Sequence, residues 1–124
     1  MNTELNIAAE NTAQIHRLVG QAPSAIDAET LQAWIDETAV LLIDVREPHE
    51  FERERIAGAF LVPLSRFDVA TFPQVRGLRT VLVSEQGGRS QAVAEHLADS
   101  GHLDVYALEG GLAAWREAGF ELDE

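Results

Sequence analysis

The chain has 124 residues, 46% of them hydrophobic and 24% charged, so it is long enough for one domain with a core and too short for two. Nine basic residues against 21 acidic ones give a formal net charge of −12, which disfavours binding to nucleic acids or anionic membranes. Cysteine is absent, which excludes disulfides, thiolate metal sites and any thiol nucleophile. No apolar run approaches the roughly 18 residues of a membrane span, and the N-terminus lacks signal-peptide features, so we expect a cytoplasmic protein.

The first 24 residues are polar with few apolar positions, and we expect them to form an N-terminal extension before a single domain over residues 25–124. The spacing of Ile15, Leu18 and Val19 is compatible with one helix in this extension. A surface-docked or frayed arm is the simpler interpretation than a dimerisation helix.

Beyond residue 24, apolar runs typical of strands alternate with segments typical of helices. Strands are expected at 40–45, within 56–63, at 80–83 and at 103–108. Helices are expected after the N-cap residue Asp27, from Pro48, between Ser90 and Gly101, and between Gly111 and Gly119, with turns or short helices in 64–75. This alternation predicts an α/β domain with a mainly parallel sheet covered by helices on both faces.

The segment VLVSEQGGRS joins the third expected strand to a helix, and its loop starts at Ser84. In a parallel α/β sheet the functional crevice lies at the carboxyl ends of the strands. Gly87 and Gly88 allow successive backbone N–H groups to turn toward one point, where the helix dipole and Arg89 would also favour an anion. A glycine turn before a helix is equally often a simple connection.

Three segments resemble the three signature blocks of the rhodanese-like domain family, in order: IDVREPHEFERERIAGAFLVP, VLVSEQGGRS and LEGGLAAWREAGFEL. Gly87, Arg89 and Ser90 match the family's active loop, C-x-x-G-x-R-S, and the last block is similar to its closing motif. The resemblance covers residues 26–122. It implies a five-stranded parallel sheet flanked by helices on both faces. It also implies a loop cysteine that carries a persulfide between a thiosulfate-like sulfur donor and an acceptor.

This chain has Ser84 at the position of the family's catalytic cysteine. A cysteine in such an electropositive loop can have its pKa lowered from about 8.5 to roughly 3.5–7.5, whereas a serine hydroxyl stays protonated without a base. The four histidines, His16, His49, His96 and His102, are dispersed, and we expect the last two at the surface. The chain as it stands is therefore expected to be inactive in sulfur transfer.

Three interpretations remain open. The chain is a serine variant of a parent sulfurtransferase, or a naturally non-catalytic module for binding or regulation, or a phosphatase-like anion pocket. The third is the weakest, because phosphatase cradles place one more residue between the first loop position and the arginine than the four found between Ser84 and Arg89. The expected partner is a small sulfur-containing anion or a protein sulfur acceptor, and the sequence does not specify an oligomeric state.

The predicted binding loop also includes Glu85 and Gln86. Glu85 adds a negative charge near the anion site, where it either weakens thiosulfate binding or points to solvent, and we favour the second interpretation. Asp44 and Arg46, at the end of the first long strand, either form the pocket wall, as the resemblance implies, or make a purely structural pair. Arg55 stands where the family commonly has histidine. No metal and no cofactor are expected, since the H-E-x-x-H zinc motif that begins at His49 lacks its second histidine.

Overall fold

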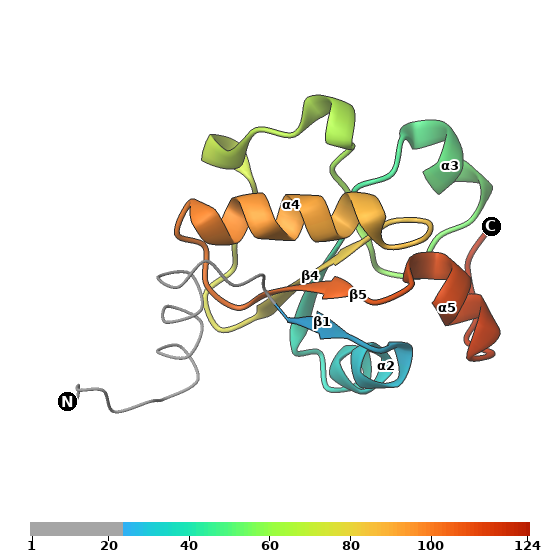
Figure 1. Cartoon of the computed structure of the whole chain (residues 1–124). Coiled ribbons are helices and arrows are strands. Elements are labelled where there is room, and N and C mark those ends of the chain that lie inside the picture. Colours follow the sequence, from blue (N-terminus) through green and yellow to red (C-terminus); the bar gives the residue numbers. More distant parts are fainter. Residues whose placement is uncertain (1–23) are drawn as a thin grey trace.

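A computed structural model describes residues 24–124 of the chain. The N-terminal extension expected for residues 1–24 lies, apart from Ser24, outside the described residues. Five strands form one sheet in the order β1-β5-β4-β2-β3, and every neighbouring pair is parallel (Figure 1). The strands are β1 (Ala25–Ile26), β2 (Val40–Asp44), β3 (Phe60–Leu61), β4 (Arg79–Val83) and β5 (Val105–Leu108).

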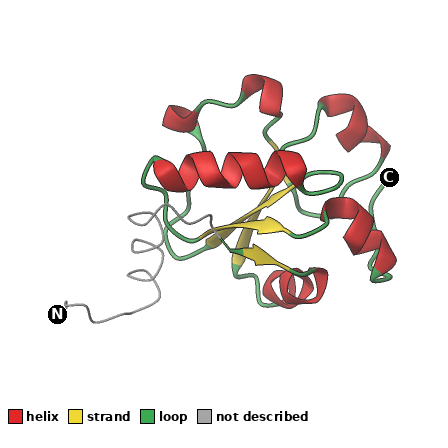
Figure 2. Cartoon of the chain, in the orientation of Figure 1, coloured by secondary structure: helices red, strands yellow, loops and turns green. Residues whose placement is uncertain are grey.

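Helices cover both faces of this sheet, as Figure 2 shows for α4 on one side and α2 on the other. The α-helices are α2 (Ala28–Asp36), α3 (Pro48–Arg53), α4 (Gly88–Asp99) and α5 (Gly111–Glu117), and two 3₁₀-helices are η1 (Leu64–Arg66) and η2 (Val69–Thr71). Asp27 caps α2 by accepting the Thr30 N–H at 2.8 Å, and Pro48 occupies the first turn of α3. The α/β architecture predicted from the sequence is thus confirmed. Within residues 24–124, no helix is long and apolar enough to cross a bilayer.

The core is divided by the sheet, because successive side chains of a strand point to opposite faces. Leu41 and Ile43 of β2 belong to one apolar cluster, which includes the buried face of α4, whereas Leu42 belongs to the other, under α2 and α5. The second cluster includes Trp115, which is 2% exposed and donates its indole N–H to the Glu121 carbonyl at 2.9 Å. The two clusters fix the sheet from both sides and hold the ends of its strands in place.

One strand was not located from the apolar pattern. The apolar pattern predicts four strands and the family resemblance implies five, and the additional strand is β1. It consists of two residues, which pair with Ala107 and Leu108 of β5. A run this short has no alternation to detect, so only its pairing with β5 defines it as a strand.

Candidate functional site

Residues 84–87 connect β4 to α4 at the carboxyl edge of the sheet, and together with the first turn of α4 they form the segment 84–90, where the sequence predicted a functional loop. The first turn of α5 holds this loop. The backbone N–H of Leu112 donates to the Ser84 carbonyl at 2.9 Å, and that of Ala113 donates to the Glu85 carbonyl at 3.0 Å. These bonds satisfy N–H groups that a helix start leaves without an intrahelical partner. The two segments of the chain therefore form one unit.

Gly111 is required for this close packing. Its φ is +62°, and a Cβ atom placed on it would overlap the Ser84 carbonyl oxygen and lie 2.7 Å from the Glu85 carbonyl carbon. Gly87, the N-cap of α4, has a φ of +97°, and a Cβ atom there would lie 3.2 Å from the Gly110 nitrogen. Both positions thus combine a left-handed backbone with close contact to a neighbouring backbone, which only glycine accommodates.

Most backbone N–H groups of the loop have no acceptor among the described residues. The N–H groups of residues 85–89 are bonded to no acceptor within residues 24–124, while the Ser90 N–H donates to Ser84 Oγ at 3.1 Å. Gly88 and Arg89 open α4, so their N–H groups lie at the positive end of its dipole. Within the described residues these N–H groups are therefore available to an anion, and the cradle itself stays a prediction.

The Ser84 hydroxyl is buried, with 1% of the residue exposed. It accepts the Ser90 N–H and donates to Ser90 Oγ at 3.1 Å, and Ser90 Oγ in turn donates to the Gly87 carbonyl at 3.1 Å. Among residues 24–124, Ser90 is the only hydrogen-bonding partner of this hydroxyl, and no base contacts it. Ser84 therefore has none of the activation that a serine nucleophile needs.

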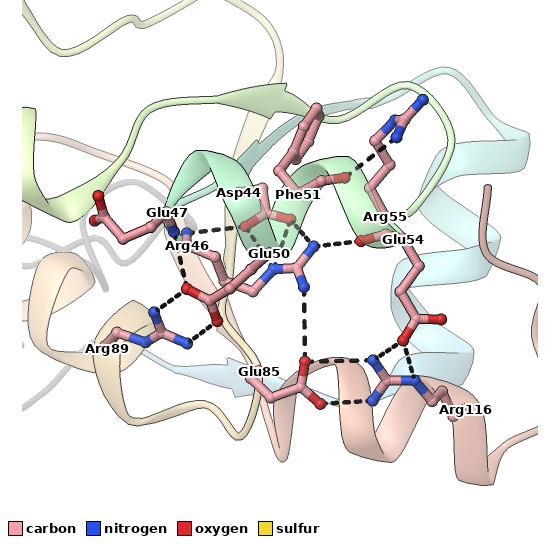
Figure 3. A network of polar contacts seen from close by, with 10 residues as sticks. All are labelled: Asp44, Arg46, Glu47, Glu50, Phe51, Glu54, Arg55, Glu85, Arg89 and Arg116. Atoms are coloured by element: carbon pink, nitrogen blue, oxygen red, sulfur yellow. Dashed lines mark hydrogen bonds and ion pairs between the residues drawn. The ribbon is translucent and has the colours of Figure 1, made fainter. Parts of the chain in front are cut away.

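Arg89 directs its guanidinium to α3 and forms a two-pronged ion pair with Glu50, in which both N···O distances are 2.8 Å (Figure 3). The hydrogen bonds from Arg89 lower the pKa of the Glu50 carboxyl from 4.5 to about 2, and Glu50 raises the pKa of Arg89. The positive charge of Arg89 is thus already compensated, and its contribution to the cradle is smaller than the sequence alone indicated.

Asp44 and Arg46 form a buried pair, 1% and 2% exposed. The Arg46 guanidinium donates to both Asp44 carboxylate oxygens, at 2.9 to 3.1 Å, and to the Glu54 carbonyl at 2.7 Å. It also lies 3.6 Å from Glu85 Oε1. The pair that the sequence offered as pocket wall or structural brace therefore braces the segment after α3 and extends to the loop.

The Glu85 side chain, expected to point to solvent, is partly exposed and is also held by an ion pair. Its side chain is 35% exposed and pairs with Arg116 of α5 at 2.6 Å, and Arg116 also pairs with Glu54 at 2.5 Å. The hydrogen bond from Arg116 lowers the pKa of the Glu85 carboxyl, and Glu85 with Glu54 raises the pKa of Arg116. Glu85 therefore lies between two guanidinium groups, those of Arg46 and Arg116 (Figure 3).

The remaining predicted residues are placed as follows. Gln86 and Gly88 are exposed, and Ser90 is buried. Arg55 donates to the Phe51 carbonyl at 3.2 Å, and its guanidinium lies over the Phe51 ring. Sequence reasoning missed Glu50, Glu54 and Arg116 as site residues, because nothing in a local pattern connects a charge on α3 or α5 to a loop tens of residues away.

Comparison with known proteins identifies the architecture. The family model described as rhodanese-like domain matches residues 27–118. The chain belongs to this family. Thiosulfate sulfurtransferase GlpE of Pseudomonas syringae is 37% identical to this rhodanese-like domain over 93 residues, which are 73% of this chain and 85% of the relative.

Two further proteins are similar over most of the domain. The Synechocystis protein slr1261 is 41% identical over 80% of this chain, which spans 55% of the length of that relative. A rhodanese-related protein from Thermoplasma volcanium has the same fold, with a TM-score of 0.67, 27% identity and coverage of 81% of this chain and 97% of that chain. The five-stranded parallel sheet and its helices are thus those of rhodanese-like structures.

Proposed function

We propose that this rhodanese-like domain has the scaffold of a sulfurtransferase and is catalytically silent because Ser84 stands where the persulfide-carrying cysteine belongs. One observation carries the proposal. Ser84 Oγ lies buried at the first position of an otherwise complete loop, bonded to the Ser90 N–H at 3.1 Å and beside free backbone donors. The similarity to thiosulfate sulfurtransferases supports the same assignment.

The reaction needs a thiolate at position 84. A thiolate attacks the outer sulfur of a donor such as thiosulfate, an S–S bond forms to the protein, and the S–S bond of the donor breaks to release sulfite. An acceptor thiolate or cyanide then takes the outer sulfur and returns the protein thiolate. The backbone N–H groups and the helix dipole would stabilise both anionic forms. The Ser84 hydroxyl keeps its proton, so it does not start this cycle.

The second candidate is a naturally non-catalytic module that binds or regulates a partner through the same loop. The ion pairs around the loop favour this second function. Each arginine there is paired with a carboxylate of the same chain, so the site is held together without any substrate. A phosphatase-like pocket has less support, because the interval between Ser84 and Arg89 is one residue shorter than in phosphatase cradles.

The Ser84→Cys variant separates these functions. Both chains are incubated with thiosulfate or with a small persulfide, and thiocyanate formation from cyanide is measured. We expect the variant to turn over at least one donor and the Ser84 chain to remain at background. A folded variant that turns over neither donor and retains no sulfur would favour the non-catalytic module.

A further inference from the structure

The charges around the loop have a feature that the proposed function does not explain. Three arginines lie near segment 84–90, and each has a carboxylate partner within 4.0 Å: Arg46 with Asp44 and Glu85, Arg89 with Glu50, and Arg116 with Glu54 and Glu85. Three positive charges therefore meet four negative ones, and the cluster has a net charge of −1. No arginine of this cluster is left for an anionic substrate.

Glu85 is the carboxylate of this cluster that belongs to the loop itself, one residue after Ser84. Its backbone carbonyl is bonded to the Ala113 N–H, and its side chain is bonded to Arg116 at 2.6 Å, with Arg46 at 3.6 Å. Contacts at both the backbone and the side chain fix its position. Because 35% of the side chain remains exposed, its charge is only partly shielded from solvent.

We propose that Glu85 determines donor specificity, disfavouring the thiosulfate dianion and favouring a persulfide flanked by positive charge. This inference rests on the proposed sulfur-transfer function and names the class of donor for the same loop. Thiosulfate that brings its outer sulfur to position 84 carries two negative charges toward a cluster whose net charge is −1 and which includes the loop carboxylate Glu85, so the like charges repel. The formal net charge of −12 adds repulsion of the same sign over a longer range.

A persulfide donor avoids this repulsion. The protein thiolate attacks the outer sulfur of R–S–SH, the S–S bond of the donor breaks, R–S⁻ leaves, and the proton stays on the protein persulfide or passes to solvent. Basic groups next to the leaving thiolate would be attracted by Glu85 and by the acidic surface of the domain. The donor is therefore expected to be a basic protein or a small persulfide that carries an amine.

The test uses the Ser84→Cys background and a set of charge variants. The second substitutions are Glu85→Gln, Arg116→Gln and, as a matched control, Glu37→Gln, which removes one exposed charge at the C-terminal end of α2. The donors are thiosulfate, cysteamine persulfide, and two peptides with one cysteine persulfide flanked by arginines or by glutamates. kcat/KM is measured for each, and a response to the arginine peptide but not to cysteamine persulfide would assign the donor to a protein source.

We expect Glu85→Gln to raise kcat/KM for thiosulfate about tenfold and to reduce the preference for the arginine peptide. Arg116→Gln is expected to act in the opposite direction, because it leaves the Glu85 charge less compensated. Opposite changes in kcat/KM indicate an effect of charge. If the two substitutions only loosened the loop, kcat/KM would change in the same direction in both variants. Glu37→Gln should stay within about twofold of its background.

An unchanged ratio of thiosulfate to arginine-peptide turnover in Glu85→Gln would overturn the inference while leaving the proposed function intact. If the Ser84→Cys background accepts no sulfur at all, the proposed function fails instead. Thiosulfate binding to the Ser84 chain, measured by calorimetry, then still tests the inference. Tighter binding by Glu85→Gln than by the unmodified chain supports it, and equal binding contradicts it.

Discussion

At the scale of single residues, the proposed function turns on one atom at position 84, the oxygen of serine in place of the sulfur of cysteine. The Ser84 hydroxyl donates to Ser90 Oγ and accepts the Ser90 N–H, so both of its hydrogen bonds are made with one residue. A thiolate at this position would have the same N–H within reach, and the Ser90 hydroxyl would be free to turn from the Gly87 carbonyl toward it. Ser90 is thus positioned to stabilise a negative charge at position 84.

This role of Ser90 is tested in the Ser84→Cys background. Replacing Ser90 by alanine removes the hydroxyl donor but keeps the backbone N–H, so we expect the thiol pKa to rise by about one unit. The rate of alkylation by iodoacetamide as a function of pH measures this pKa. Ser100→Ala, which removes a hydroxyl bonded to the His96 carbonyl at the end of α4, is the control and should leave the thiol pKa unchanged.

At the scale of elements, two helices hold the loop: α3, which precedes it in the chain, and α5, which follows it. The first turn of α5 donates two backbone hydrogen bonds to the loop, and Gly111 allows the approach. On the other side, Glu50 of α3 pairs with Arg89 of α4. Removing either contact should therefore lower the free energy of unfolding, because it weakens the packing of a helix against its neighbours.

The Gly111→Ala variant tests the packing of α5 on the loop. Its Cβ would be 2.7 Å from the Glu85 carbonyl carbon, so we expect a loss of about 2–4 kcal/mol in the free energy of unfolding. Gly119→Ala is the matched control, because Gly119 also has a positive φ of +85° but a Cβ there meets nothing within 4 Å. It should cost only about 1 kcal/mol of backbone strain. Equal losses in urea unfolding would show that packing on the loop is not the cause.

The Glu50–Arg89 pair predicts how the stability of the fold changes at acid pH. Because Arg89 lowers the pKa of the Glu50 carboxyl to about 2, the pair stabilises the fold above the ordinary pKa of 4.5, and this contribution is lost as the pH falls from there toward 2. We expect Glu50→Gln to cost about 0.5–1 kcal/mol near pH 6, since the pair is partly exposed, and almost nothing near pH 2.

Urea unfolding at a series of pH values measures this difference. Glu95→Gln, which changes an exposed carboxylate on α4 bonded to Gln91, is the control and should give a small difference at every pH. A cost of Glu50→Gln that does not change with pH would contradict the assignment of the pair.

At the scale of the whole molecule, the parts of the fold predicted from the sequence are those with local signals. The run over 40–45 and the glycines of the loop indicated β2 and the turn into α4 at Gly87, because buried strands and left-handed turns depend on the nearest residues. The contact of Glu50 with Arg89 spans 39 positions and that of Glu85 with Arg116 spans 31, so no periodicity relates the partners. Tertiary packing alone decides where such side chains point, which is why the sequence does not predict the pairing of Glu85 with Arg116.

The central claim, a sulfurtransferase loop without its thiol, is tested most directly by sulfur uptake. The Ser84→Cys variant is incubated with a persulfide donor and analysed by intact mass, with the unmodified chain and Ser84→Ala as controls. We expect the variant alone to gain the mass of one sulfur atom at position 84 and to lose it on treatment with cyanide. A folded Ser84→Cys variant that gains no sulfur, or gains it equally in the controls, would contradict the account.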